Sequence, residues 1–208
     1  PILCILAILV LNLGVESAVL ELNVRGVDGN PAAGVVFQIF PGSVGVDDDV
    51  MPLVLGKPSA DKRDNDGDGE IDEAGEDFAG YATNADGKLR LDLADGLYTL
   101  VGFSQSRHLL LVTEASVPDS VVIDAADAVP VDISCLAVDG SAIVGAEIFF
   151  RPTKRSRASV GFTNNGGLLR ARISTGEYHA VLWSGSGEGP HYLILPYQVV
   201  AAPDTEVD

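Results

Sequence analysis

The chain has 208 residues, of which 47% are hydrophobic, and 30 acidic against 13 basic residues give it a formal charge of −17. The hydrophobic fraction excludes a disordered acidic tail, because disorder requires low hydrophobicity together with high charge. The charge argues against nucleic acid or an anionic membrane surface as a partner, and two cysteines are too few for a disulfide framework.

Residues 2–11 form an unbroken apolar run that continues with breaks to Val15. Three interpretations are open. The run has the length of a signal-peptide hydrophobic region, although no basic residues precede it. As a helix, residues 2–15 would reach only ~21 Å, short of the ~30 Å hydrocarbon core of a membrane. As a strand they would reach ~45 Å, which is long enough to cross another domain.

We favour the strand, so that residues 1–18 form an arm outside either predicted core, with a signal segment as the alternative. Both faces of an extended arm are apolar, as in a strand that is covered on two sides. A pairing of Cys4 with Cys135 is left open. The residues expected to drive polymerisation are the large aliphatic residues of the run: Ile2, Leu3, Ile5, Leu6, Ile8, Leu9, Val10 and Leu11.

Two copies of one pattern follow the arm. A strand, an Asp-Gly turn and a Gly-initiated strand occur at 24–39 and again at 135–150, at an offset of 111. A Thr-Asn-x-x-Gly turn, an alternating strand and an x-Gly-x-Tyr turn occur at 83–98 and again at 163–178, at an offset of 80. Because the offset falls, the first copy carries an insertion. The period-2 alternation predicts half-buried strands, and glycine-containing turns at ~8–12-residue spacing indicate a sandwich.

The sequence therefore predicts an all-β fold of two tandem β-sandwich modules, 19–124 and 125–208, with an insertion at 41–79 in the first. Through Val27-Asp28-Gly29, Thr83-Asn84-Ala85-Asp86-Gly87 and Asp95-Gly96-Leu97-Tyr98, the chain resembles the transthyretin-like or carboxypeptidase-regulatory-like family, with its Ig-like sandwich, and the B-type repeats of bacterial surface adhesins. The resemblance implies a spacer, adhesion or stalk module at a bacterial cell surface or outside the cell. It implies no substrate.

The insertion at 41–79 holds twelve Asp and Glu residues against three Lys and Arg, and so contributes −9 of the net charge. Its centre resembles the calcium loop of EF-hand or dockerin proteins, in which hard oxygen ligands alternate around a glycine-permitted turn. Gly75 stands where an EF-hand has its bidentate Glu, and no flanking helices are evident. We predict Ca²⁺ binding, with an unoccupied solvated loop as the alternative. The predicted ligands are Asp64, Asp66, Asp68, Glu70, Asp72 and Glu76.

The corresponding loop of the second copy is basic, with Arg151, Lys154, Arg155 and Arg157 inside seven residues. One interpretation is a solvated charged loop. The other is a complementary contact between modules or between subunits, which would set orientation more than affinity.

No catalytic constellation appears, since the three histidines lack metal-ligand spacing and the Gly-rich segment at 184–189 lacks the residues of a phosphate loop. We therefore expect a non-enzymatic protein.

The leading hypothesis is an extracellular fibre or pilus subunit, which forms a helical homopolymer. In it, the arm of one subunit inserts into an incomplete sandwich of another, in the manner of donor-strand pilins. It has no nucleic-acid partner and no stable membrane span. The alternatives are a monomeric secreted Ca²⁺-binding adhesin or stalk with a residual signal peptide, and a carbohydrate- or peptide-binding accessory domain.

Overall fold

The computed structural model describes residues 17–53, 81–184 and 191–200. These residues form strands and two short 3₁₀ helices, η2 (Gln105–Arg107) and η3 (Ala125–Asp127), which confirms the predicted all-β class. No helix within these ranges is long and apolar enough to cross a membrane. The strands are β1 (Ser17–Arg25), β2 (Val36–Pro41), β3 (Lys88–Ala94), β4 (Gly96–Ser104), β5 (Leu109–Val117), β6 (Asp119–Asp124), β7 (Val129–Ser134), β8 (Glu147–Arg151), β9 (Ser159–Phe162), β10 (Leu168–Ile173), β11 (Gly176–Ser184) and β12 (His191–Val199).

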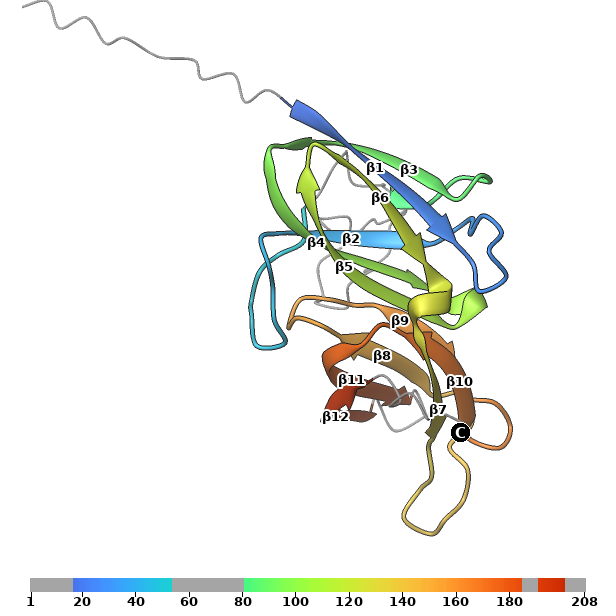
Figure 1. Ribbon diagram of the computed structural model, residues 1–208. Helices are drawn as coiled ribbons and strands as arrows, with labels where there is room; N and C mark the ends of the chain where they lie inside the picture. Colours follow the sequence, from blue (N-terminus) through green and yellow to red (C-terminus); the bar gives the residue numbers. More distant parts are fainter. Residues whose placement is uncertain (1–16, 54–80, 185–190, 201–208) are drawn as a thin grey trace, which may run out of the picture.

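The strands form three sheets that are stacked as layers (Figure 1). The first sheet has the order β3-β1-β6, the middle sheet β2-β4-β5-β10-β7, and the third β12-β11-β8-β9. We call β1–β6 the first half and β7–β12 the second half. The middle sheet takes strands from both halves, which join where β5 runs parallel to β10 with Leu110 opposite Ile173. The halves are therefore linked by backbone hydrogen bonds.

The first-half strands of the middle sheet are buried on both faces. Leu100 of β4 and Leu111 of β5 belong to the hydrophobic cluster shared with the first sheet, whereas their neighbours Val101 and Leu110 belong to the cluster shared with the third sheet. Because successive side chains of a strand point to opposite faces, a strand between two cores must be apolar at consecutive positions. This requirement accounts for the continuous apolar stretches in β4 and β5.

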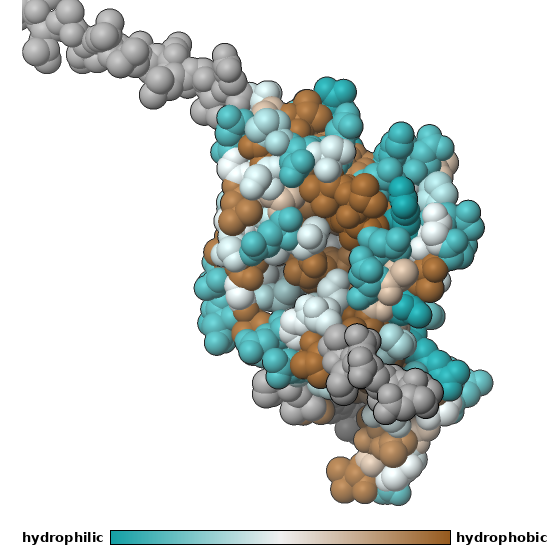
Figure 2. All heavy atoms as spheres, viewed as in Figure 1, coloured by the Kyte–Doolittle hydropathy of each residue, from teal (hydrophilic) through white to brown (hydrophobic). Residues whose placement is uncertain are grey.

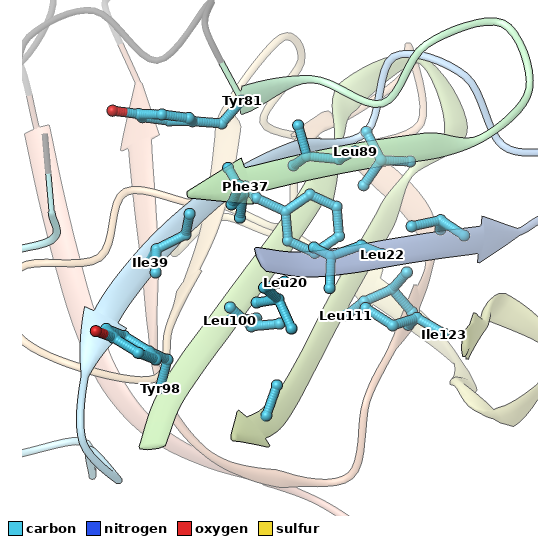
Figure 3. Close-up of a cluster of buried hydrophobic side chains, with 14 of the residues drawn as sticks. Leu20, Leu22, Phe37, Ile39, Tyr81, Leu89, Tyr98, Leu100, Leu111 and Ile123 are labelled. Carbon is cyan, nitrogen blue, oxygen red and sulfur yellow. The ribbon is translucent and has the colours of Figure 1, made fainter. Parts of the chain in front are cut away.

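The first core lies between the first sheet and the middle sheet. Figure 3 shows the side chains of β1 meeting those of β2, β4 and β5. Leu20, Leu22 and Phe37 are each no more than 1% exposed. Full burial of a large aliphatic or aromatic side chain stabilises a fold by about 1.5–3 kcal/mol, so this cluster is a main source of stability for the first half.

The repeated x-Gly-x-Tyr turns have the same geometry in the two halves. The Tyr98 hydroxyl donates a 2.9 Å hydrogen bond to the backbone carbonyl of Ala94, and the Tyr178 hydroxyl donates a 2.7 Å bond to that of Ser174. Each tyrosine thus ties the start of its strand to the end of the preceding strand, as in the tyrosine corner of Ig-type sandwiches. The sequence repeat corresponds to a structural repeat at this turn.

The repeated Thr-Asn-x-x-Gly turns also match, and each needs its glycine for two reasons. Gly167 has φ +71°, and a Cβ there would overlap the backbone carbonyl oxygen of Cys135. Gly87 has φ +69° and the same relation to Val24. A left-handed conformation alone costs a non-glycine residue about 1–2 kcal/mol, and the close approach adds to that cost.

We expect Gly167→Ala to destabilise the protein by about 3 kcal/mol or more, because alanine there meets both the left-handed backbone and the Cys135 carbonyl. Gly140→Ala is the matched control, since Gly140 has φ +83° but nothing lies within 4 Å of an added Cβ, and it should cost only about 1 kcal/mol. Urea denaturation measures both. Equal losses would show that the close approach adds nothing.

Candidate functional site

Two groups of predicted site residues lie outside the described residues. They are the aliphatic residues of the arm, 2–11, and the calcium ligands of the acidic insertion, 64–76. Their predicted roles therefore stay predictions. Within the described ranges, no group of three or more His, Cys, Asp or Glu side chains could hold a metal ion.

The structure does describe where the acidic insertion meets the sandwich. The Leu53 backbone N–H donates a 2.6 Å hydrogen bond to the Ile39 carbonyl, and the Leu53 side chain packs against the first core. On the far side of the insertion, Tyr81 is only 4% exposed and belongs to the same core. The acidic insertion is thus anchored to the first core at both ends. Binding of a ligand to the insertion would therefore change the stability of the first half.

The basic loop of the second half contacts the first half within the same chain. Arg155 forms an ion pair with Asp49, in which its Nη2 lies 3.3 Å from Asp49 Oδ2. The Lys154 backbone N–H donates a 3.1 Å bond to the Asp48 carbonyl. The hydrogen bond from Arg155 holds the pKa of the Asp49 carboxyl below its usual range. The stabilisation that this ion pair contributes is therefore present at pH values above the usual carboxyl pKa. It is lost as the pH falls through the lowered pKa of Asp49.

A buried polar contact lies beneath this ion pair. Gln38 of β2 is 1% exposed, and its Oε1 accepts hydrogen bonds from Ser156 Oγ at 2.9 Å and from the Arg157 backbone N–H at 3.2 Å. The sequence analysis missed this link between the halves. The available signal was a single amide inside the apolar stretch Val36–Pro41, because a buried polar group needs a partner.

Within the described residues, the two halves also differ on the side of the equivalent strands β1 and β7 that faces away from β3 and β10. In the first half, β1 lies between β3 and β6 and pairs with both. In the second half, β7 pairs with β10 on one side, and no other strand among the described residues pairs with its opposite edge. The second half therefore has no described counterpart of β6.

An apolar groove lies beside this unpaired edge. It has a volume of about 390 Å³ and lies between β7 on one side and β8, β11 and β12 on the other. Ile133 and Cys135 line it from the β7 side, and Phe150, Leu193 and Tyr197 line it from the third sheet. The rings of Phe150 and Tyr197 meet edge to face at 5.5 Å. The sequence analysis did not predict this groove, because its presence depends on which strands pair.

Comparison with known proteins finds only distant likenesses. No protein-family profile and no curated protein matches the sequence. Solved structures that resemble it include a streptococcal ancillary pilin (12% identity, TM-score 0.27, 88% of this chain and 59% of that one). Others are a shaft pilin from Lactobacillus rhamnosus GG (13%, 0.30, 89% and 100%) and a DUF3823 family protein from Bacteroides ovatus (14%, 0.28, 88% and 98%). The chain spans about three fifths of the streptococcal pilin. At these TM-scores the likenesses do not bear on function.

The contact between the halves can be tested with one buried and one exposed substitution. Ser156→Ala should destabilise the protein by about 1–2 kcal/mol, because it removes a hydrogen bond from the buried Gln38 amide oxygen. Asp49→Asn removes the exposed ion pair and should change the stability little. Thermal or urea denaturation compares the two variants. A larger loss from Asp49→Asn than from Ser156→Ala would contradict this ranking.

Proposed function

We propose that the protein is an exported structural subunit that assembles with copies of itself into an extracellular fibre. In this proposal the apolar arm of one subunit inserts into the sandwich of the next. The observation that carries it is the arm's position in the chain: ten consecutive apolar residues, 2–11, precede a strand whose own core is already filled. Leu20 and Val24 of β1 are fully buried, as is Leu22, so the first half leaves the arm no evident place in its own core.

The energetics favour insertion between molecules. Burying a large aliphatic side chain contributes about 1.5–3 kcal/mol, so eight of them give a gross gain on the order of 10–20 kcal/mol. Ordering the arm and losing free rotation and translation offset part of that gain. An arm at one place and an acceptor at another make a head-to-tail contact, which propagates into a filament unless it closes into a ring.

Removal of residues 1–16 tests this function directly. Because β1 begins at Ser17, the truncated chain should fold with the same unfolding midpoint as the full chain but should form no filaments. Electron microscopy and analytical ultracentrifugation of both proteins measure the outcome. Filaments from the truncated chain would contradict the proposal. So would mass spectrometry showing that assembled material begins near Val19.

A second candidate function is a secreted Ca²⁺-binding adhesin or stalk module that stays monomeric. The observation that favours it is the acidic insertion, whose alternating carboxylates have the composition of an oxygen-ligand site for a hard cation. Carboxylates crowded into one loop repel each other without a counter-ion. Since the insertion begins and ends at the first core, a cation that orders it would stabilise the first half. Calcium binding is also compatible with the fibre.

We expect Ca²⁺ at millimolar concentration to raise the melting temperature of the full chain, since extracellular sites of this kind bind at ~10⁻⁴ to 10⁻³ M. Asp66→Ala should abolish that rise. Asp86→Ala is the control, because it removes a carboxylate from an exposed turn outside the insertion and should leave the rise intact. Calorimetry with Ca²⁺ and with Mg²⁺ measures the change in melting temperature. An unchanged melting temperature of the parent chain in Ca²⁺ would contradict the predicted calcium binding.

A further inference from the structure

We propose that the groove beside β7 is the acceptor for the arm of a second copy of this chain, which lies parallel to β7 as β6 lies parallel to β1. This inference rests on the proposed function and adds the place of insertion. It follows from a comparison of the two halves, which are built on the same repeat, although no described strand of the second half takes the place of β6.

In the first half, β6 shows what an occupant of this position does. It runs parallel to β1, with Val121 opposite Leu22 and Ile123 opposite Val24. Ile123 is 8% exposed and belongs to the first core, against which Val121 packs. A strand at this position thus satisfies the edge of β1 with hydrogen bonds and closes the core with apolar side chains two residues apart.

In the second half the equivalent inward side chains are less covered. By the offset of 111, Val131 and Ile133 correspond to Leu20 and Leu22. Leu20 and Leu22 are at most 1% exposed, whereas Val131 and Ile133 are only partly buried. Among the described residues no strand covers Val131 and Ile133 as β6 covers Leu20 and Leu22, so this part of the second core is open at the edge of β7.

Apolar side chains at the groove and beyond it are also exposed. Of the residues that line the groove, Leu136 is 56% exposed, Leu193 51% and Tyr197 41%. Figure 2 shows apolar atoms at the lower tip of the molecule, where the loop that follows β7 lies, and Val138 and Val144 of this loop are exposed as well. Exposed apolar side chains of this kind are typical of an interaction site, and the edge of β7 that pairs with no described strand offers backbone donors and acceptors to an added strand.

The arm matches this site in length and in side chains. β6 pairs with six residues of β1, and residues 2–11 supply ten apolar positions. Because side chains alternate along a strand, one set of the arm would face the groove, either the even-numbered residues from Ile2 to Val10 or the odd-numbered residues from Leu3 to Leu11. Both sets are apolar, so either register fills the groove without burying a polar group.

The chain's own last residues match the site less well. Pro203-Asp204-Thr205 repeats Pro118-Asp119-Ser120, which begins β6. Continued at that offset, Glu206 and Asp208 fall at the positions of Val121 and Ile123. Two carboxylates would then face the apolar groove, and burying an unpaired carboxylate is costly.

The position of β1 favours insertion between molecules. In Figure 1, β1 begins at the end of the first half that is remote from the second half, and β7 lies at the opposite end of the molecule. The arm therefore starts far from the groove of its own subunit. Insertion into the next subunit would repeat the same head-to-tail contact along a fibre.

Cysteine cross-linking of the full chain tests the inference, because Cys135 lines the groove and Cys4 lies in the arm. In a Cys4→Ser background, a single cysteine is placed in turn at Ile5, Leu6, Ile8 and Leu9, and assembled protein is oxidised with diamide. Burial raises the pKa of the Cys135 thiol, so the reaction is run at mildly alkaline pH. We expect a covalent ladder on a non-reducing gel from one alternating set only, at position 6, at position 8 or at both, or else at one of positions 5 and 9. The other set should give no ladder, because only the arm residues nearest to Cys135 come within disulfide distance.

The matched control moves the acceptor cysteine to the first half. Val24 is the counterpart of Cys135 and is covered by β6, so Val24→Cys combined with Cys135→Ser should give no ladder with any arm cysteine. Ladders through position 24 alone would overturn the assignment of the groove. Filaments that depend on residues 1–16 but show no cross-link at Cys135 would also overturn this assignment. Neither result would contradict the proposed function.

A third variant identifies the competing occupant. Asp208→Cys in the Cys4→Ser background should not cross-link to Cys135, although position 208 corresponds to Ile123, which lies opposite the Cys135 counterpart Val24 in the first half. An efficient intramolecular disulfide there would show that the chain's own residues 203–208 fill the groove, and would overturn the inference. Filaments that persist without residues 1–16 would instead remove the proposed function itself, and with it this inference.

Discussion

The shared middle sheet is the constraint on which the rest of the structure depends. Where β5 meets β10, the Arg172 N–H donates to the His108 carbonyl at 2.8 Å and the Ser174 N–H to the Leu110 carbonyl at 3.0 Å. This junction makes one sheet from strands of both halves and gives it a core on each face. Every strand of the first half that enters this sheet must then supply apolar side chains to both cores. The buried contact of Gln38 with the loop of the second half is possible only because β2 lies in this layer.

The sequence repeat predicts the local structure well because local interactions set it. The tyrosine hydroxyls, the left-handed glycines and the amide oxygens of Asn84 and Asn164 act within a few residues of their own positions. Asn84 Oδ1 accepts from the backbone N–H groups of Asp86 and Lys88, and Asn164 Oδ1 accepts from those of Gly166 and Leu168. Such contacts are readable from spacing alone. The alternation in β3 likewise predicts its one-sided burial, which the structure confirms.

Features set by long-range pairing were not readable in the same way. The groove beside β7 depends on whether a strand lies next to β7, and the corresponding pair in the first half joins residues about a hundred positions apart. The period of β7 indicates an inward face, but it does not show what covers that face. The basic loop was predicted either to stay solvated or to contact another module or subunit, because its charge does not identify the acidic group that it contacts. The structure places Arg155 on Asp49 of the same chain.

The net charge of −17 adds a physical reason for a separate arm. Subunits with this charge repel one another at long range, which opposes lateral association of their bodies. In the proposed fibre, the uncharged, apolar arm would supply the contact free energy at one groove of the next subunit despite this repulsion. An apolar arm and an apolar groove would each be an aggregation hazard if they stayed uncovered. When each covers the other on a neighbouring molecule, the same two surfaces favour a single axis of growth. Raising the ionic strength should then weaken the repulsion while leaving arm insertion largely unchanged, so that added salt promotes bundling of fibres more than their elongation.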